Sequence, residues 1–460
     1  RCSVGASPER QGACESRAPF RSAVAALLGC RYPYRGLVQR LSIYLDAPSA
    51  NPKLVHDRGF TDLADNLDTT REAGMYRNRR RVESPQGRTL TIDGRELLNF
   101  CSNDYLGLAS DSRISAAFQR GAARWGTGTG ASHLICGHTA AHEALEEALA
   151  DFCGRPRALL YSSGYAANVG VINALLTEGD HVFEDRLNHA SLLDGGWISR
   201  AQFAWYAHGD VTDLRAGLDA VRAASTRKLI VSDATFSMDG DRCPLDDLIE
   251  TAAEHRAWLM IDDAHGIGVH GPAGVGLVDP ARYSTRDVPV LIGTLGKAFG
   301  VAGAFVAGEE ALIETLIQRS RNYIFTTAMP AAMAEATLAS LAIVRAEDWR
   351  RERIEELVAR FRAGARRLGF ELLDSDSPVQ PLIVGDPRAA VAMSRELESR
   401  GCLCTAIRPP TVPTGTSRLR ITLTAAHSTA DVDRLLAALA EAAAVEHPEP
   451  EPEPEAQRRA

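Results

Sequence analysis

Long apolar runs, an excess of basic charge and paired cysteines are all missing from this sequence of 460 residues. No apolar stretch approaches the roughly 20 residues that a membrane span needs, so we expect no membrane partner. Lysine and arginine total 51 against 59 aspartates and glutamates, which gives a formal charge of −8. That balance gives no sign of a basic surface that would bind nucleic acid.

Metal-binding patterns are also missing. Among the nine cysteines the one close pair is Cys402 and Cys404, which lacks both the two-residue gap and the second pair of a zinc site. The 12 histidines contain no His-Glu-x-x-His motif. We therefore expect no structural metal and interpret the cysteines as reduced thiols of a cytoplasmic protein.

The two ends of the chain differ in composition from the middle. Residues 1–55 carry three of the nine cysteines and precede the first methionine, Met75. Two readings are open, a targeting peptide or sequence translated upstream of the true start, and the second is favoured; under either, we expect a poorly ordered extension outside the site. Residues 445–460 are rich in proline and glutamate and are expected to be disordered.

Between these ends, short apolar segments alternate with amphipathic ones. Apolar runs at 158–161, 181–183, 228–231, 258–261 and 288–292 predict buried strands of a mostly parallel sheet. The alternation with helices, among them 59–82 and 142–152, predicts an α/β fold. We expect a large domain at 99–340 and a smaller α+β domain at 341–444, which the N-terminal segment 56–98 joins through a hairpin turning at Asp93-Gly94.

Polar residues follow these strands at their carboxyl ends, where ligands bind in open parallel sheets. Lys297 stands between Gly296 and Ala298, which leave room around its amine for a carbonyl cofactor, although an ordinary loop lysine fits the same pattern. Asp262 ends another strand, and its carboxylate could hold a pyridine nitrogen protonated. An N-cap aspartate and a buried histidine at 265 are the structural alternative.

Three further sites complete the pattern. The strand, turn and helix around Gly164 offer free backbone donors that suit a phosphate. The alternative is that this segment is an ordinary capping turn. His189 could stack on a flat cofactor, although a lone histidine is more often structural. Arg418 and Arg420 point to one face of a strand, where one could clamp a carboxylate; for Arg418 we expect a solvent-facing edge instead.

In combination these motifs resemble a known family. Asp-Asp-Ala-His at 262–265, Thr-Leu-Gly-Lys at 294–297 and Ser-Ser-Gly-Tyr at 162–165 resemble fold-type I pyridoxal-phosphate enzymes. Within that group, residues 102–108, 188–191, 236–241 and 415–420 are similar to the α-oxoamine synthases, which join an amino acid to an acyl thioester with loss of CO₂. Residues 405–413 resemble the members that use L-alanine and a pimeloyl thioester in biotin biosynthesis. The resemblance covers about 56–444.

The resemblance implies a seven-stranded sheet, pyridoxal 5'-phosphate as cofactor and a homodimer with shared sites. It implies catalytic roles for Lys297, which would bind the cofactor covalently, for Asp262 at the pyridine nitrogen and for His189 stacked on the ring. Further cofactor contacts would come from Gly164, Tyr165, Ser237, His265 and Thr294, and across the dimer from Thr326 and Thr327. L-Alanine and pimeloyl-CoA, or a pimeloyl-acyl-carrier protein, would meet Arg77 (with Arg79 as a rival), Asn103, His189, Thr411 and Arg420.

Some positions depart from the family pattern. His133 and Cys136 stand where the family more often has arginine and serine, and Asp233 stands where glutamate is commoner. Two other functions are open: a sister α-oxoamine synthase that uses glycine or serine, and a non-catalytic binding protein on the same fold.

Overall fold

The computed structural model of the protein describes residues 60–72, 76–221 and 226–444. The chain divides into two compact units, Arg1–Asn78 and Arg79–Ala460. The extension at 1–55 and the tail at 445–460 lie outside the described residues. In the first unit the described helix is α3 (Thr61–Glu72).

The helix expected over 59–82 is therefore too long. Residues 76–81 are not helical, and Val82 instead forms a bridge with Ile92. Arginines at 77, 79, 80 and 81 would repel one another on neighbouring turns of a helix. In the second unit, Arg80 and Arg81 instead pair with Glu398 and Glu83.

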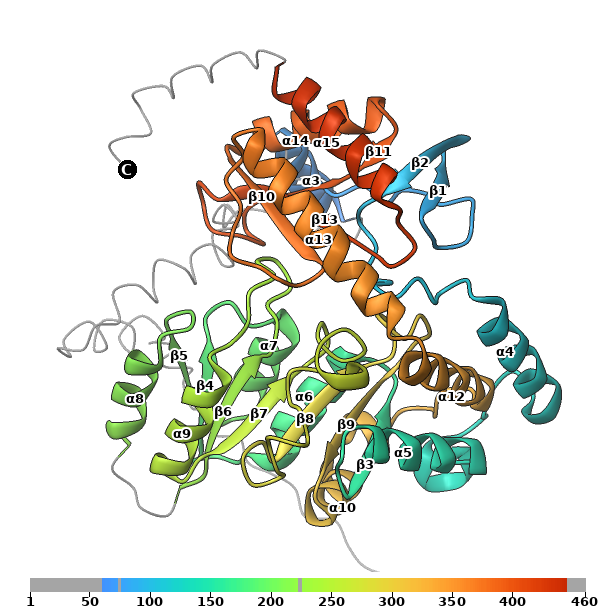
Figure 1. The fold of residues 1–460 in the computed structure, drawn as a ribbon. Helices are drawn as coiled ribbons and strands as arrows, with labels where there is room; N and C mark the ends of the chain where they lie inside the picture. Colours follow the sequence, from blue (N-terminus) through green and yellow to red (C-terminus); the bar gives the residue numbers. More distant parts are fainter. Residues whose placement is uncertain (1–59, 73–75, 222–225, 445–460) are drawn as a thin grey trace, which may run out of the picture. The chain divides into compact units, whose positions relative to one another are not determined.

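Seven strands form a sheet in the order β3-β9-β8-β7-β6-β4-β5 (Figure 1). They are β3 (Arg157–Tyr161), β4 (His181–Asp185), β5 (Gln202–Tyr206), β6 (Lys228–Asp233), β7 (Trp258–Asp262), β8 (Val290–Thr294) and β9 (Ala304–Gly308). β8, β7, β6, β4 and β5 pair in parallel, and β9 runs antiparallel to both of its neighbours. The predicted, mostly parallel seven-stranded sheet is confirmed.

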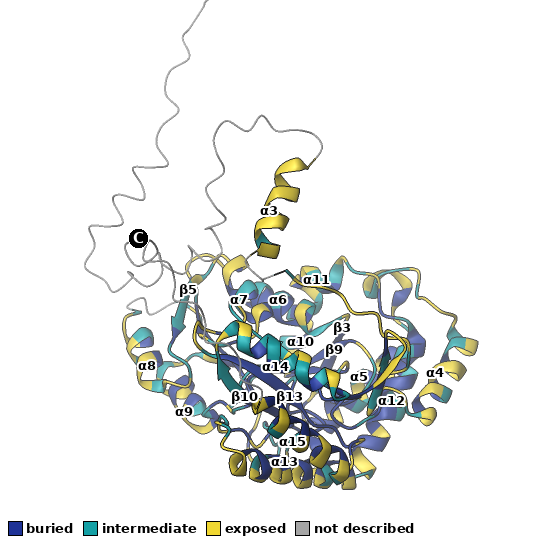
Figure 2. Ribbon diagram, turned by 90° about the horizontal axis from the view of Figure 1, so that it is seen from above, coloured by how far each residue is buried: buried dark blue, intermediate teal, exposed yellow. Residues whose placement is uncertain are grey.

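Helices cover both faces of this sheet because successive strand residues point to opposite sides. Leu160 and Ile230 face one core, with helices α5, α8 and α9, whereas Leu159 and Val231 face a second core, with α6, α7 and α10. Every residue of β8 and β9 is buried. Figure 2 shows buried residues inside the molecule and exposed ones on the outer sides of the helices. The helices on these faces are α5 (Ala140–Phe152), α6 (Gly164–Leu175), α7 (Ala190–Ile198), α8 (Val211–Asp219), α9 (Leu245–His255) and α10 (Glu310–Arg319).

Two three-stranded sheets lie apart from the large one. The hairpin of β1 (Thr89–Ile92) and β2 (Arg95–Asn99) is joined in parallel by β11 (Cys402–Leu403). Its turn has positive φ at Asp93 (51°) and Gly94 (70°), so the hairpin turn predicted there is confirmed. The other sheet has the order β10-β13-β12, with β10 (Val379–Gly385), β12 (Thr405–Ile407) and β13 (Ser417–Thr422).

The solvent-facing edge expected for Arg418 is wrong. β13 is the central strand of its sheet, and Arg418 is 3% exposed and paired with Asp239. The alternation of Arg418 and Arg420 on one face of the strand did not reveal that a loop from the large sheet covers that face.

The remaining helices of the described residues are α4 (Ser112–Trp125), α11 (Arg321–Ile324), α12 (Ala331–Ala346), α13 (Trp349–Arg367), α14 (Pro387–Ser399) and α15 (Thr429–Ala443), with short helical turns at His133–Gly137 and Pro272–Gly274. The expected boundary between 340 and 341 falls inside the continuous helix α12, and the domain division stays a prediction. None of the helices in the described part of the chain is both long and apolar enough to cross a membrane.

Candidate active site

The carboxyl ends of the strands bring the predicted site residues to one edge of the large sheet. β7 ends at Asp262 and β8 ends at Thr294, three residues before Lys297. His189 follows β4, Ser237 follows β6, and Gly164 opens α6 just after β3. The residues come from five strands that are distant in sequence, so the sheet itself assembles the site.

Lys297 lies in a tight turn between β8 and β9, and its amine lies 2.8 Å from Nε2 of His265. Burial lowers the pKa of Lys297 to about 8, against the opposing effect of Asp262 and Asp233. A buried amine with a lowered pKa is partly neutral near neutral pH, which is the state that a nucleophile or base needs.

Asp262 is 4% exposed, and both of its carboxylate oxygens have a donor. Oδ1 accepts the backbone N–H of Ala264 at 3.0 Å, and Oδ2 accepts the side-chain amide of Asn168 at 2.7 Å. Asn168 also donates to Ser191 Oγ at 2.9 Å. Asn168 belongs to a stretch that the sequence marked as a phosphate turn, but no signal in the sequence pointed to its contact with Asp262.

His189 caps the N-terminus of α7. Its Nδ1 accepts the backbone N–H of Ser191 at 3.3 Å and lies 2.7 Å from the Ser191 hydroxyl. Since Nδ1 is an acceptor, the proton of the neutral ring lies on Nε2. Burial lowers the pKa of His189, with Lys297 adding to the effect against Asp262, which favours that neutral ring.

Asp233 supports this histidine from the strand beside Asp262. It accepts the backbone N–H of His189 at 2.6 Å and pairs in register with Asp262. Burial and the neighbouring Asp262 carboxylate raise the pKa of Asp233 well above its usual range. The aspartate that replaces the commoner glutamate therefore still makes a close contact in the site.

His265 is the centre of a hydrogen-bonded chain. On one side its Nε2 meets Lys297, and on the other its Nδ1 lies 2.5 Å from the hydroxyl of Tyr105. Burial lowers the pKa of His265 well below its usual range, and Lys297 and Arg420 lower it further. Arg420 donates from both Nη atoms to Asn103 Oδ1 at 3.2 Å. No role was predicted for Tyr105 from the sequence.

The residues expected to contact the phosphate lie at the start of α6 and at the end of β8. The side chain of Ser163 caps α6 by accepting from Ala166, and a Cβ built on Gly164 would meet no atom within 4 Å. Tyr165 is 49% exposed and donates its hydroxyl to Asp194. Thr294 donates to the carbonyl of Gly303 at 3.2 Å.

The other predicted contacts lie on loops. The carbonyl of Ser237 accepts from Nε of Arg420 at 2.7 Å, which joins the β6 loop to β13. Thr411 is exposed in the loop after β12. Thr326 is half-buried and Thr327 exposed, and Thr327 pairs with Ser132. Arg77 is exposed in the first unit, and its role stays a prediction.

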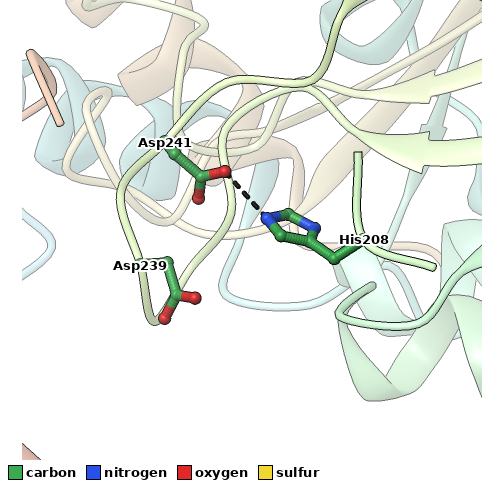
Figure 3. Close-up of side chains that lie close together, drawn as sticks. All are labelled: His208, Asp239 and Asp241. Carbon is green, nitrogen blue, oxygen red and sulfur yellow. Dashed lines mark hydrogen bonds and ion pairs between the residues drawn. The ribbon is translucent and has the colours of Figure 1, made fainter. Parts of the chain in front are cut away.

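A second polar cluster brings His208 together with Asp239 and Asp241 (Figure 3). The ring donates through Nε2 to Asp241 at 2.9 Å and through Nδ1 to Asp185 at 3.0 Å, and Asp239 pairs with Arg418. Burial lowers the pKa of His208, but the two carboxylates outweigh it and raise the pKa to about 10. A protonated imidazole has no lone pair for a metal, so this cluster is a set of ion pairs.

The residues present fit pyridoxal phosphate. The open space before Gly164 and the free N–H groups of the α6 N-terminus suit a phosphate. The buried carboxylate of Asp262 suits a protonated pyridine nitrogen, and the amine of Lys297 suits an aldehyde carbon. The contacts predicted for His265 and Ser237 with a phenolic oxygen stay predictions.

Comparison with known proteins gives the same picture. Residues 95–439 match the model of the aminotransferase class I and II family. An 8-amino-7-oxononanoate synthase of Alcanivorax borkumensis is 57% identical over 83% of this chain and 98% of its own length. One from Nitrosococcus oceani is 58% identical over 80% of this chain and 97% of its own length. The chain belongs to the 8-amino-7-oxononanoate synthases.

Solved structures place this 8-amino-7-oxononanoate synthase family member in the same fold. An 8-amino-7-oxononanoate synthase from Francisella tularensis is 28% identical, with a TM-score of 0.66 over 75% of this chain and 97% of that chain. A serine palmitoyltransferase from Sphingomonas wittichii is 29% identical, with a TM-score of 0.78 over 83% and 96%. The predicted family, fold and cofactor are thereby confirmed.

Proposed function

We propose that the chain condenses L-alanine with a pimeloyl thioester, with loss of CO₂, to give 8-amino-7-oxononanoate and a free thiol in biotin biosynthesis. The observation that carries this proposal is the buried amine of Lys297, held 2.8 Å from His265 in a turn beside the carboxylate of Asp262. The identity of 57% to a synthase of that name supports the choice of substrates.

When bound, pyridoxal phosphate supplies an electron sink for the charge left on the α-carbon of the amino acid. Asp262 holds a proton at the pyridine nitrogen, and Asn168 keeps the carboxylate in place for this task. Lys297 takes the α-proton of L-alanine and later returns it, since its pKa of about 8 lets both protonation states exist near neutral pH.

Substrate groups meet two other residues. Arg420 presents its guanidinium to the carboxylate of L-alanine. Its hydrogen bonds to Asn103 and to the carbonyl of Ser237 fix the plane of the guanidinium. His189 keeps its proton on Nε2, which donates to the oxygen of the thioester carbonyl as negative charge develops there.

A substrate screen with product mass measured tests this function. The purified protein is offered L-alanine, glycine and L-serine, each with pimeloyl-CoA, pimeloyl-acyl-carrier protein, acetyl-CoA, succinyl-CoA and palmitoyl-CoA. We expect turnover with L-alanine and a pimeloyl donor, and the screen also decides between the two pimeloyl carriers. Lys297→Ala should abolish both turnover and the visible absorption band of the lysine-bound cofactor. Retention of both would refute the proposal.

One observation favours a second candidate. The serine palmitoyltransferase has the higher TM-score, 0.78 against 0.66 for the Francisella synthase. The sequence identities point the other way, because 57% to a synthase exceeds 29% to the transferase. Product formed from L-serine and palmitoyl-CoA, and none from L-alanine, would establish the second candidate. A colourless protein that does not respond to pyridoxal phosphate would indicate a binding protein.

We also propose a homodimer in which Thr326 and Thr327 contact the phosphate held by the partner subunit. Beside these threonines, Ile135 is 78% exposed and Phe325 is 70% exposed, an apolar surface that a second copy would cover. Ile135→Asp should give monomers by analytical ultracentrifugation and weaken cofactor binding. Leu368→Asp, at a residue 41% exposed after α13, is the matched control and should stay dimeric.

The proposed compartment is the cytoplasm. Six cysteines fall within the described residues, and all six are free thiols. Reduced thiols are usual for cytoplasmic enzymes.

A further inference from the structure

Tyr105 is a buried tyrosine that contacts two of the predicted site residues, His265 and Asn103. It lies in the loop between β2 and α4 and is 0% exposed. Its hydroxyl is 2.5 Å from Nδ1 of His265 and 3.3 Å from Oδ1 of Asn103. The hydroxyl has one proton to donate, and the choice of acceptor sets the state of the histidine.

The surrounding bonds decide that choice. Oδ1 of Asn103 already accepts from both Nη atoms of Arg420. Nδ1 of His265 is nearer to the hydroxyl, and the described residues give it no other donor. Burial raises the pKa of Tyr105, so the hydroxyl keeps its proton. The tyrosine therefore donates to Nδ1.

We infer that Tyr105 is a positioning residue whose hydroxyl donates to Nδ1 of His265 and thereby holds the ring proton on Nε2. Nε2–H then points to Lys297 and to the place where the phenolic oxygen of pyridoxal phosphate would lie. This inference rests on the proposed function, because it deepens the account of that same site.

A proton fixed on Nε2 of His265 favours one protonation state of Lys297. An Nε2–H group donates to a neutral amine, whereas an unprotonated Nε2 would accept from an ammonium group. Holding the proton on Nε2 thus favours the neutral lysine, and it equally favours an ionised phenolic oxygen on the cofactor. The effect on the phenolic oxygen is the one that would remain when the cofactor is bound to the lysine, and it would lower the pH at which the lysine-bound cofactor loses its proton.

Other charged groups face the same two side chains. Asp262, Asp233 and Arg420 act on Lys297, and His189 and Arg420 act on His265. All of these groups are retained when Tyr105 alone is changed. A difference between wild type and Tyr105→Phe therefore reports the hydroxyl.

The test is a pH titration of the visible absorption band of the protein loaded with pyridoxal phosphate, without substrate. Tyr105→Phe should raise the midpoint by roughly 0.4 to 1 pH unit, the equivalent of one hydrogen bond to an uncharged group. Replacement of Tyr105 by 3-fluorotyrosine, a more acidic phenol and a stronger donor, should move the midpoint down. This second variant keeps the hydroxyl and its packing if the phenylalanine variant folds poorly.

The matched control is Tyr206→Phe, at a tyrosine 2% exposed in β5. It removes a buried hydroxyl of the same kind outside this hydrogen-bonded chain and should leave the midpoint unchanged. An unchanged midpoint in both Tyr105 variants would overturn the inference, and so would an equal shift in Tyr206→Phe. A wild type that binds pyridoxal phosphate but makes no product would refute the proposed function alone, because the titration needs no substrate.

Discussion

Replacing Asn168 by alanine should destabilise the cofactor-free protein by about 2–4 kcal/mol. Its amide donates to the carboxylate of Asp262 at 2.7 Å and to the hydroxyl of Ser191 at 2.9 Å. A hydrogen bond to a charged group contributes about 1.5–3 kcal/mol and one to a neutral group about 0.5–1.5 kcal/mol. Asn168 is 1% exposed, so water cannot fully replace either bond.

The same helix offers a matched control in Asn173→Ala. Asn173 is half-buried, and its amide donates to the carbonyls of Val169 at 2.8 Å and Gly195 at 3.1 Å. Both variants gain the same helix propensity, which cancels in the comparison. Asn173→Ala should lower the free energy of unfolding by about 1–2 kcal/mol, because its two acceptors are neutral and water can reach the site.

Urea unfolding of the cofactor-free variants, at one protein concentration so that any dimerisation contributes equally, measures the difference. The loss of unfolding free energy should be larger in Asn168→Ala than in Asn173→Ala by at least about 1 kcal/mol, which is the extra contribution of a charged acceptor. If the two variants unfold at the same urea concentration with the same slope, the hydrogen bond from Asn168 to Asp262 contributes no more to stability than a bond to a neutral acceptor, and the prediction is wrong.

Two other substitutions follow from the fold. In His208→Gln, the ion pairs with Asp185 and Asp241 are lost; because they raise the pKa of His208 from 6.5 to about 10, their stabilisation is full below pH 6.5 and disappears as the pH rises through 10. The variant should therefore cost about 2 kcal/mol at pH 6 and nothing measurable above pH 10 in urea unfolding. In Gly196→Ala, the new Cβ would lie 2.6 Å from the ring of Phe203 and would also meet Oε1 of Glu184, so we expect the free energy of unfolding to fall by about 1–3 kcal/mol and the Tm to drop.

Both substitutions have controls in the chain. His255→Gln removes an imidazole 3.8 Å from the exposed carboxylate of Asp219 and should lower the free energy of unfolding at pH 6 by less than His208→Gln does. Gly128→Ala places a Cβ that meets no atom within 4 Å and should leave the Tm within a degree or two. A Gly128→Ala loss as large as that of Gly196→Ala would contradict the steric explanation.

The sequence predicted those parts of the sheet whose strands are apolar on both faces. β6, β7 and β8 were recognised from such runs, but β5 and β9 were not. β5 is an edge strand with an exposed residue and three half-buried ones, and its pattern is neither alternating nor wholly apolar. β9 consists of Ala-Phe-Val-Ala-Gly directly after the lysine turn, where small residues also suit a loop.

The site was predicted one residue at a time, and its connections were not. Lys297, Asp262 and Gly164 each follow a strand, which local patterns reveal. The contact of Tyr105 with His265 joins residues 160 positions apart. Local spacing carries no information about such pairs, because the strand order of the sheet decides which loops meet.

The turn that carries Lys297 has one more consequence. Strands β8 and β9 close it by pairing Thr294 with Ala304, and Leu295 donates to the carbonyl of Gly303 at 2.9 Å. Within the turn, Gly300 donates to the carbonyl of Lys297 at 2.9 Å. The peptide bearing the amine is thus anchored on both sides, and the amine can exchange partners by χ rotations alone. No rearrangement of strands β8 and β9 is therefore needed when the amine changes its partner.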